Sequence, residues 1–560
     1  MQKAVKQVCI AALAAAALVV AFLAAMPRAE VFAASAWDTP ASVIRIDENN
    51  INDLIDHRAD GETTITDNDG EYTAKRETYA PADRQWQGLA SIAVTGDRLW
   101  ACWYTGGTGE PREFNYVVVA YSDDGGMNWV DPFAVIDSKT VVQENAGVCE
   151  VVCNLFTDED GELYLTYMQS KTWAVKFSNA DAENIDDVAM SEPYILTEAK
   201  LHKSPVVIRD ADGSAVWAIA YDSVSGSSDV TYTYMAVSKD KGVTWQERGR
   251  LTGSVPAARK YPESQLAQTK DGRLIMMSRI EGGQAGGIEV AYSDDYGATW
   301  TAYANNLTEP YIGPGSKGHI MALSSGNLLV INHNTTLERG GLTAYLSEDG
   351  GETFPYRLSL DMRSGSVQTG CSYPSACEKD GRIYAVWDFG RYVQKEIRLS
   401  VFTEEDIRTG AFVSEGDVYK QAVSKLNPDY KEIVKVNATY ERTMTFVVGT
   451  ESETIREQLP VSFSVEDSAG GVYDLTGMWR ASGYNKDEPG SYLFRFTAEG
   501  LPVTVEDCMD LLTVRVILRE EEGGCAGLCG GAAAACILPA VAVNAAALAL
   551  VGRKKRAARP

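Results

Sequence analysis

Residues 293–300 read Ser-Asp-Asp-Tyr-Gly-Ala-Thr-Trp, and the chain repeats the underlying pattern, Ser-x-Asp-x-Gly-x-Thr-Trp, four times. The other copies lie at residues 122–129, 238–245 and 347–354, with Asn in place of Thr in the first of them and Phe in place of Trp in the last. Each copy follows an apolar, strand-like run. In a hairpin turn the Asp accepts backbone N–H groups, the Gly adopts a positive φ and the aromatic residue packs beneath the hairpin. We therefore interpret these four boxes as structural turns.

The spacing of the boxes predicts how many units the fold contains. The second, third and fourth boxes lie 55 and 54 residues apart, whereas the first and second are 116 apart, which leaves room for one more unit. Degenerate copies start at Ser178 and after Leu399. Six units of roughly 55 to 60 residues each match a four-stranded sheet with its loops, and such sheets repeat radially in β-propellers. We predict an all-β fold with a six-bladed propeller over residues 75–415.

Composition restricts the class of function. A chain of 560 residues exceeds a single compact core, so more than one domain is expected. Its net charge of −26 argues against nucleic-acid binding, because only the last few residues are basic enough to meet phosphates. The four histidines are scattered, and no Cys/His spacing suits a metal. We expect no metal and no cofactor.

The two ends of the chain carry targeting signals. Residues 1–36 read as a secretory signal peptide, with a retained N-terminal anchor as the alternative, and an extension follows over residues 37–74. A Gly/Cys linker (521–531) leads into an apolar segment (532–551) that is long enough to span a membrane. The basic tail (552–560) would remain cytoplasmic. This layout resembles the C-terminal anchors of bacterial surface proteins and predicts an extracellular, cell-surface protein.

Residues 430–520 differ from the propeller in character. They contain short alternating strands separated by turns, after a predicted linker at residues 416–429. This pattern is similar to bacterial immunoglobulin-like modules and predicts a small β-sandwich that acts in spacing or adhesion.

The boxes and their order resemble the sialidase (neuraminidase) family over roughly residues 80 to 410. The resemblance implies an acidic proton donor and a Tyr nucleophile that a Glu makes basic. It also implies three arginines that bind the carboxylate of the substrate. A Tyr nucleophile distinguishes sialidases from other retaining glycosidases. Because a phenol is neutral, it can approach an anionic sugar that would repel a carboxylate.

Most of these positions have a counterpart in the chain. The segment PESQLAQTKDGRLIMMSR maps the Glu and the second arginine to Glu263 and Arg279. The third arginine corresponds to Arg339, shortly before the fourth box, and the nucleophile to Tyr373 in GCSYPSA after it. The proton donor maps to Glu110 in GTGEPREFNY, where the family usually has Asp.

The first arginine of the family has no counterpart. Its position aligns with Gly88, beside Gln87, which we take as a possible substrate contact. Arg84 or Arg112 could supply the missing charge from nearby. The loss of one charged hydrogen bond would cost about 1.5–3 kcal/mol.

Two further features leave alternatives open. Asp388 and Arg391 in WDFGRYVQKEI form either an ion pair at the rim or a substrate contact, and the structural interpretation is favoured. Cys371 and Cys377 flank Tyr373 and could form a disulfide bridge outside the cell or remain buried free thiols.

The resemblance implies an exo-acting glycoside hydrolase of sialidase type, which removes terminal sialic acid or a related sugar from glycoproteins, glycolipids or oligosaccharides with retention. Glu110 would protonate the leaving oxygen, Glu263 would accept the proton of Tyr373, and Arg279 and Arg339 would hold the anionic group. The missing arginine favours an alternative, a propeller glycosidase for another terminal sugar. A third possibility is a non-catalytic surface protein that binds glycans or mediates adhesion.

Overall fold

The computed structural model describes most of the chain between residues 40 and 520. The gaps are residues 54–62, 68–69, 75–77, 108, 111–114, 138–150, 226–228, 253–262, 281–286, 303, 306–307, 337, 364–368, 428, 432, 437–439, 442, 468, 482–483 and 500–511. The predicted signal peptide, Gly/Cys linker, membrane segment and basic tail lie outside the described residues. Within the described ranges, no helix is long and apolar enough to cross a membrane.

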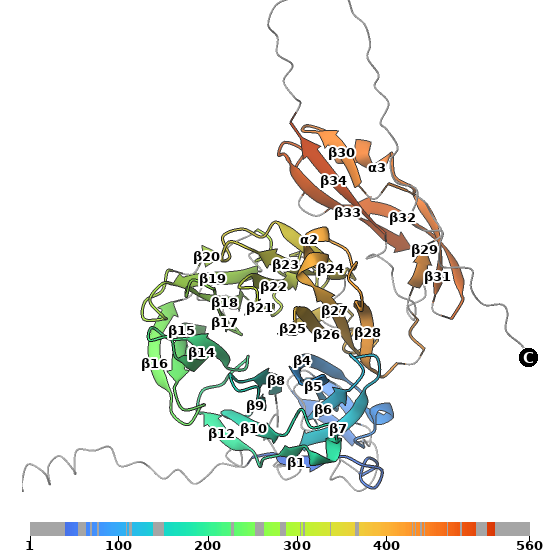
Figure 1. Cartoon of the computed structure of the whole chain (residues 1–560). Helices are drawn as coiled ribbons and strands as arrows, with labels where there is room; N and C mark the ends of the chain where they lie inside the picture. The colour runs from blue at the N-terminus through green and yellow to red at the C-terminus, as the bar shows by residue number, and fades with distance from the viewer. Residues whose placement is uncertain are drawn as a thin grey trace, which may run out of the picture.

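Six antiparallel sheets are arranged in a ring around a central axis (Figure 1). This arrangement confirms the predicted six-bladed propeller. In each blade the first strand is the innermost and the following strands pair in chain order, except that in the second blade both β11 and β12 pair with β10. The first blade contains β4 (Gln87–Thr95), β5 (Arg98–Thr105), β6 (Tyr116–Ser122) and β7 (Val130–Asp137), and the second contains β8 (Val151–Thr157), β9 (Leu163–Met168), β10 (Thr172–Ser178), β11 (Ala189–Met190) and β12 (Tyr194–Thr197). The third contains β13 (Val206–Arg209), β14 (Ala215–Ser225), β15 (Asp229–Ser238) and β16 (Gln246–Thr252), and the fourth contains β17 (Gln265–Gln268), β18 (Leu274–Ile280), β19 (Gly287–Ser293) and β20 (Ala304–Asn305). The fifth contains β21 (His319–Ala322), β22 (Leu328–His333), β23 (Leu342–Ser347) and β24 (Tyr356–Asp361), and the sixth contains β25 (Cys371–Lys379), β26 (Arg382–Phe389), β27 (Glu396–Thr403) and β28 (Val418–Lys425).

Strand direction separates the two faces of the propeller. Every box lies between the third and fourth strands of its blade, as residues 293–300 lie between β19 and β20. The boxes therefore mark one face of the propeller. Because the strands are antiparallel, the opposite face contains the start of each first strand, the end of each second strand and the start of each third strand. Loops at that opposite face carry Glu110, Glu263, Arg339 and Arg391, so the boxes and these residues lie at different ends of the molecule.

The glycine of each box packs against the preceding blade. A Cβ atom on Gly126 would lie 2.2 Å from Leu399, one on Gly242 would lie 2.5 Å from Leu196, and one on Gly297 would lie 2.3 Å from Met235. All three glycines also have φ between 86° and 93°, a conformation that a side chain disfavours. The boxes therefore act as joints between neighbouring blades, which explains why the sequence repeats them.

We expect Ser293→Ala to destabilise the propeller without altering its chemistry. The buried Ser293 hydroxyl donates to Asp295 Oδ1 at 2.8 Å and accepts from Gly297 N at 2.9 Å, so its loss leaves a buried N–H unsatisfied. The expected cost is about 1–2 kcal/mol, which lowers the Tm by roughly 2–6 °C. Differential scanning calorimetry measures the shift, with the exposed Ser214→Ala as control. An unchanged Tm would contradict the structural role of the box.

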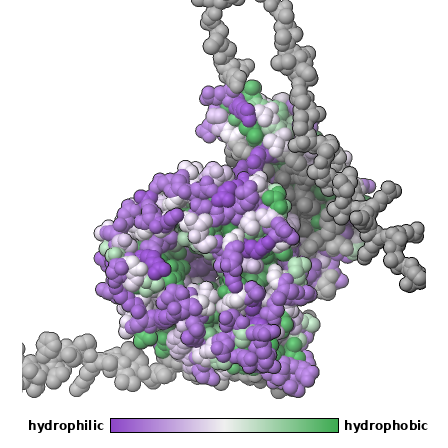
Figure 2. Space-filling model, in the orientation of Figure 1, coloured by the Kyte–Doolittle hydropathy of each residue, from purple (hydrophilic) through white to green (hydrophobic). Residues whose placement is uncertain are grey.

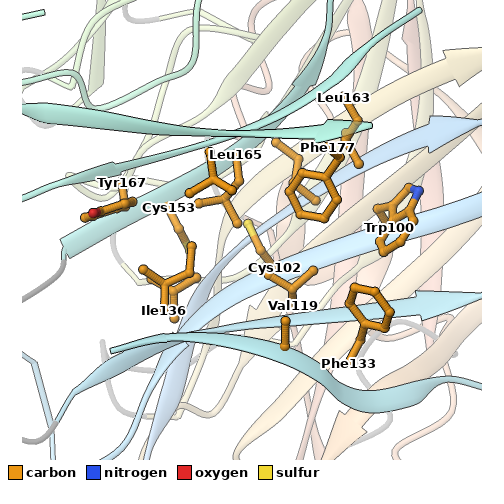
Figure 3. Close-up of a cluster of buried hydrophobic side chains, with 14 of the residues drawn as sticks. Trp100, Cys102, Val119, Phe133, Ile136, Cys153, Leu163, Leu165, Tyr167 and Phe177 are labelled. Atoms are coloured by element: carbon orange, nitrogen blue, oxygen red, sulfur yellow. The ribbon is translucent and has the colours of Figure 1, made fainter. Parts of the chain in front are cut away.

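Apolar clusters between adjacent blades form the core of the propeller. Figure 3 shows the cluster between the first and second blades, where Trp100 packs against Phe133 and Phe177 with ring centroids 5.3 and 5.4 Å apart. The same cluster contains Cys102 and Cys153 as free thiols. Cys371 and Cys377 are free as well, so the bridge considered around Tyr373 is absent from the structure. Buried free thiols behave as small apolar side chains.

The ring closes between the sixth and first blades by polar contacts as well as apolar packing. Gln87 Nε2 donates to the carbonyl of Lys395 at 2.6 Å, and the Ser424 hydroxyl donates to Asp131 at 2.8 Å. Ser424 belongs to β28, the outer strand of the sixth blade, which we had assigned to a linker at residues 416–429. This boundary is corrected to about residue 425, because the register of β27 with β28 completes the blade.

Among the described residues, three short strands precede the first blade. β1 (Ser42–Arg45) pairs with β7 and adds a fifth strand to that blade, so part of the predicted N-terminal extension belongs to the propeller. β2 (Thr63–Asp67) and β3 (Gly70–Ala74) form a separate hairpin. The described residues also contain the 3-10 helices Pro81–Asp83 and Ile185–Asp187, and α2 (Glu404–Thr409) follows β27 with a capping box from Thr403 and Asp406.

A second all-β domain follows the propeller (Figure 1). Its six-stranded sheet has the order β29 (Ile433–Val436), β31 (Ser462–Asp467), β32 (Val472–Arg480), β33 (Gly490–Glu499), β34 (Thr513–Arg519) and β30 (Thr443–Val447), and it includes the short α3 (Ser452–Arg456). Phe463, Trp479 and Phe496 form its aromatic core. Arg495 donates to Asn334 at 2.6 Å, which ties this domain to the propeller loop that carries Arg339.

Candidate active site

Among the described residues, four inner strands have a residue with left-handed backbone two positions before the regular part of the strand begins. Tyr373 has φ 55° and Glu263 has φ 42°, and Leu89 and Val152 occupy the matching positions of the first two blades with φ 58° and 52°. Register shifts accompany Leu89, Val152 and Tyr373. Left-handed backbone costs roughly 1–2 kcal/mol for a non-glycine residue and concentrates at functional sites.

Four cationic side chains surround the ring of Tyr373. The guanidinium carbons of Arg391, Arg339 and Arg279 lie 4.3, 5.2 and 5.9 Å from the ring centroid, and Lys317 Nζ lies 5.0 Å from it. All five side chains are buried, and they come from three different blades. Only the closed ring can therefore assemble this group.

Arg279 joins Tyr373 to Glu263. Its Nη1 donates to Glu263 Oε2 and to the Tyr373 hydroxyl, both at 2.7 Å. Because the phenol oxygen accepts this bond, its own proton remains available for donation. Arg279 lies near the end of β18 and Glu263 just before β17, so the first hairpin of the fourth blade holds the pair.

Two of the four cations have no carboxylate partner among the described residues. Arg339 donates to Ser372 Oγ at 3.3 Å, and its Nε is buried without a hydrogen bond. Lys317 donates to the carbonyl of His202 at 3.3 Å. Buried charges without a counter-ion are costly, so this arrangement favours an anionic group from outside the chain.

Arg391 is the centre of a chain of charged groups. Its Nη1 contacts Glu110 Oε1, and its Nη2 donates to Asp388 Oδ2 at 2.9 Å. Asp388 also accepts from Leu89 N at 3.0 Å and from the Ser372 hydroxyl at 2.6 Å. Arg391 and Asp388 are fully buried, whereas the Glu110 side chain is 24% exposed. This chain places a carboxyl group at the mouth of the site.

Aromatic and aliphatic side chains form one wall beside Tyr373. Trp86 and Tyr104 pack edge to face with ring centroids 5.6 Å apart, and Leu89, Val152 and Met168 complete the cluster. Figure 2 shows mainly hydrophilic residues surrounding a central hollow of the propeller. An apolar wall facing a cationic wall suits a ligand that has both an acidic group and a carbon-rich face.

The pKa values of Glu263 and Glu110 are shifted in opposite directions. Burial by itself would raise the pKa of Glu263, but Arg279 and Lys317 outweigh it and lower that pKa to about 2. Burial raises the pKa of Glu110 above its usual range, with Arg391 opposing the shift and Asp388 adding to it. Burial and the charge of Glu263 also raise the pKa of Tyr373. Two carboxyls whose environments separate their pKa values suit a base and an acid.

The structure brings Tyr373, Glu263, Arg279 and Arg339 to one place, and Glu110 reaches it through Arg391. It does not bring Arg84 there. The buried Arg84 pairs with Asp131 at 2.7 Å and donates to the carbonyl of Tyr79, so the expectation that it replaces the missing arginine is wrong.

Gln87 does not act as a substrate contact either, because its amide is occupied by Lys395 and Ser424 in the ring closure. This corrects the assignment made from its position beside Gly88. Arg112 lies outside the described residues.

Sequence reasoning missed the contact of Arg391 with Glu110 and the position of Lys317 beside Tyr373. In the segment WDFGR, Asp388 lies near the end of the buried β26 and Arg391 follows that strand. The ion pair that the sequence favoured there is confirmed, with Arg391 Nη2 at 2.9 Å from Asp388 Oδ2. Lys317 lies two residues before β21, as Glu263 lies two residues before β17. Tyr373 has the same offset from Ser375, where β25 resumes its regular pairing with β26.

A cavity of about 840 Å³ lies beyond these residues, among the inner strands of the propeller. The later parts of the inner strands line it, including Asn154, Leu266 and Cys377, and none of the residues around the Tyr373 hydroxyl takes part. It therefore opens toward the face that carries the boxes.

The fold and its boxes define the class of the protein as a six-bladed β-propeller built from BNR-type repeats. The family of BNR repeat-like domains matches residues 97–385, more than half of the chain, and the chain belongs to this family. The comparison with curated proteins finds no match.

The solved structures similar to this chain include three sialidase-type proteins. A Hadza microbial sialidase is 18% identical, with a TM-score of 0.44 and coverage of 60% of this chain and 70% of its own. The intramolecular trans-sialidase from Ruminococcus gnavus is 14% identical, with a TM-score of 0.43 and coverage of 58% and 95%. The Trypanosoma rangeli sialidase is 14% identical, with a TM-score of 0.40 and coverage of 82% and 88%.

Proposed function

We propose that the protein is an exo-acting glycoside hydrolase that removes a terminal acidic sugar of the sialic acid class from a glycoconjugate, with retention of configuration. The observation that carries the proposal is the contact of Tyr373 with a guanidinium that also binds an ionised glutamate, beside the buried Arg339, which has no carboxylate partner among the described residues. A purely binding propeller has no need of a phenol, a base and an acid in one pocket.

In the proposed reaction the Tyr373 oxygen attacks the anomeric carbon of the sugar and Glu263 accepts the phenol proton. The bond between the anomeric carbon and the leaving oxygen breaks, and Glu110 donates its proton to that oxygen. Water then attacks the anomeric carbon from the face that the leaving group vacated, opposite Tyr373, and gives a proton to Glu110. The bond between the anomeric carbon and the Tyr373 oxygen breaks, and Tyr373 recovers its proton from Glu263. Arg279 and Arg339 hold the substrate carboxylate through both steps.

A panel of aryl glycosides tests the proposal with the full-length protein. We expect turnover of an aryl sialoside and no turnover of matched neutral-sugar glycosides, with NMR showing that the first product has the anomeric configuration of the substrate. Turnover of neutral sugars alone would support the other propeller glycosidase. Glycan binding without any turnover would support the adhesion protein.

The pKa directions predict the pH dependence of kcat/KM. Glu110 donates a proton, so it is active below its pKa, and the raised pKa extends activity to higher pH than an ordinary glutamate allows. Glu263 must be ionised, and a pKa of about 2 keeps it so across the usual assay range. We therefore expect a decline only on the basic side when kcat/KM is measured between about pH 4 and 9. In Glu110→Gln this decline should disappear, and its persistence would assign it to another group.

A further inference from the structure

The cavity of about 840 Å³ among the inner strands, here called the inner cavity, is lined by residues from all six blades. It opens toward the boxes, so its entrance is separate from that of the site around Tyr373. Its volume lies within the usual range of small-molecule sites and is large enough for a monosaccharide. The proposed hydrolysis uses none of the residues that line it.

The side chain of Lys203 closes the end of the inner cavity that lies behind Tyr373. Lys203 precedes the third blade, yet its Nζ lies 3.3 Å from His319 Nδ1 in the fifth blade and 3.3 Å from the carbonyl oxygen of Pro374 in the sixth. The side chain therefore crosses the ring from one side to the other. Lys203 lines the cavity, and among the described residues it forms no ion pair with a carboxylate.

Polar side chains from five blades form a layer at this closed end. Each is the first residue of the regular part of its inner strand, so strand register places them at one level. They are Ser91, Asn154, Gln265, His319 and Ser375. Ser91 Oγ lies 3.2 Å from Ser375 Oγ, and Gln265 donates to the carbonyl of Gly318 at 2.8 Å. These contacts engage three members of the layer and leave Asn154 and His319.

Asn154 and His319 each have a buried nitrogen without a hydrogen-bond partner, Nδ2 and Nε2 respectively. Burial and the charges of Lys203 and Lys317 hold the pKa of His319 well below its usual value, so the ring is neutral. When its Nδ1 accepts from Lys203, the ring proton lies on Nε2, which is then a donor. Because buried donors without acceptors are costly, the closed end favours a ligand that accepts hydrogen bonds.

The charge of the cavity wall is opposite in sign to that of the whole chain. Lys203, Arg209 and Lys379 line the inner cavity, and among its described lining residues only Glu378 is acidic. Both carboxylate oxygens of Glu378 already accept from Ser324, at 2.6 Å. In a chain with a net charge of −26, a cationic cavity of this kind attracts anions.

The pKa of Lys203 is consistent with a missing counter-charge. Burial and the charge of Lys317 lower it well below its usual value, and the charge of Glu263 opposes the shift. A bound carboxylate would supply the counter-charge and favour the ammonium form, in which two N–H groups meet His319 and Pro374 and the third is free for the ligand.

The strands themselves favour a hydroxylated ligand. The inner strand of each blade pairs with one neighbour only, so its other edge presents N–H and C=O groups toward the cavity. A hydroxyl group both donates and accepts, so it can bond to either kind of group. Apolar residues such as Leu155, Leu266 and Ile320 line the same wall and suit the carbon skeleton of a sugar.

We propose that the inner cavity is a second binding site, which takes a hydroxylated carboxylic acid of monosaccharide size. Lys203 Nζ, His319 Nε2 and Asn154 Nδ2 hold the carboxylate at the closed end, and the strand edges bind the hydroxyl groups. This site is separate from the one around Tyr373 and does not depend on the proposed hydrolysis.

Titration calorimetry of the full chain with D-glucuronate tests the proposal, and D-glucose is the matched neutral sugar. Lys203→Met removes the ammonium group and keeps an unbranched side chain, and Asn154→Leu removes the amide with little change in size. Replacing a buried, unpaired charge by an apolar side chain should keep or raise the Tm, so Lys203→Met is expected to fold. The exposed Lys200→Met is the matched control. Arg339→Met reports binding beside Tyr373.

We expect the wild type to bind D-glucuronate at least about tenfold more tightly than D-glucose. Lys203→Met and Asn154→Leu should each raise the Kd for D-glucuronate by about tenfold, whereas Lys200→Met and Arg339→Met should leave it unchanged. The two cavity variants remove donors from different blades, so one remains informative if the other fails to fold.

Three results would overturn the proposal. The first is a wild type that binds no D-glucuronate, which would leave the inner cavity to water. The second is the same Kd in the wild type and both cavity variants. The third is a loss of binding confined to Arg339→Met, because the acid then binds beside Tyr373.

Discussion

Replacing Tyr373 by phenylalanine is expected to reduce kcat on an aryl sialoside by at least about a thousandfold. The change removes only the oxygen that forms the proposed covalent bond, while the ring keeps its contacts with Arg391 and the other cations. Without that oxygen, Glu263 has no nucleophile to activate. KM should change little, because Arg279 and Arg339 remain in place.

The matched control is Tyr384→Phe, since Tyr384 lies on β26 of the same blade at the end nearer the boxes. It should retain full activity. Rapid quenching of the wild type followed by peptide mass spectrometry should find the sugar on Tyr373. Substantial activity in Tyr373→Phe would show that another group, or water directly, attacks the anomeric carbon.

Replacing Glu110 by glutamine should reduce kcat/KM by about 10²–10⁴-fold on a glycan substrate whose leaving group is a sugar alcohol. Glutamine keeps the size of the side chain and cannot donate a proton to a departing alkoxide. A nitrophenyl leaving group needs little protonation, so the first step on a nitrophenyl sialoside should be far less affected. Asp388 still pairs with Arg391 in this variant, which preserves the position of the guanidinium.

A much larger loss of kcat/KM on the sugar-alcohol leaving group than on the nitrophenyl leaving group would identify Glu110 as the acid. In the nitrophenyl reaction the second step should become limiting, because Glu110 also activates water there, and a burst of nitrophenol should appear. The exposed Glu192→Gln serves as control. Equal losses on both leaving groups would assign Glu110 to positioning Arg391 and would leave the proton donor to be found elsewhere.

The sequence predicted the propeller because the boxes are local structures. A Ser hydroxyl that bonds Asp295, a glycine with φ near 90° and an aromatic residue lie within eight positions of one another, so short-range chemistry defines them. Their spacing then gave the number of blades. The blade boundary near residue 425 was missed because β28 has no box and is recognised only by its pairing with β27.

The sequence by itself determined the repeated turns, the six units and the positions of Tyr373, Glu263, Arg279, Arg339 and Glu110 within them. Only the tertiary structure decided which arginine stands at Gly88. Arg84 is near Gly88 in sequence, but it is used up by Asp131, whereas Arg391 comes from about 300 residues further along. Closure of the ring brings the first and last blades together, and a side chain can fill a space only if the neighbouring blade leaves it empty. That condition involves two distant segments at once, so no local pattern could reveal it.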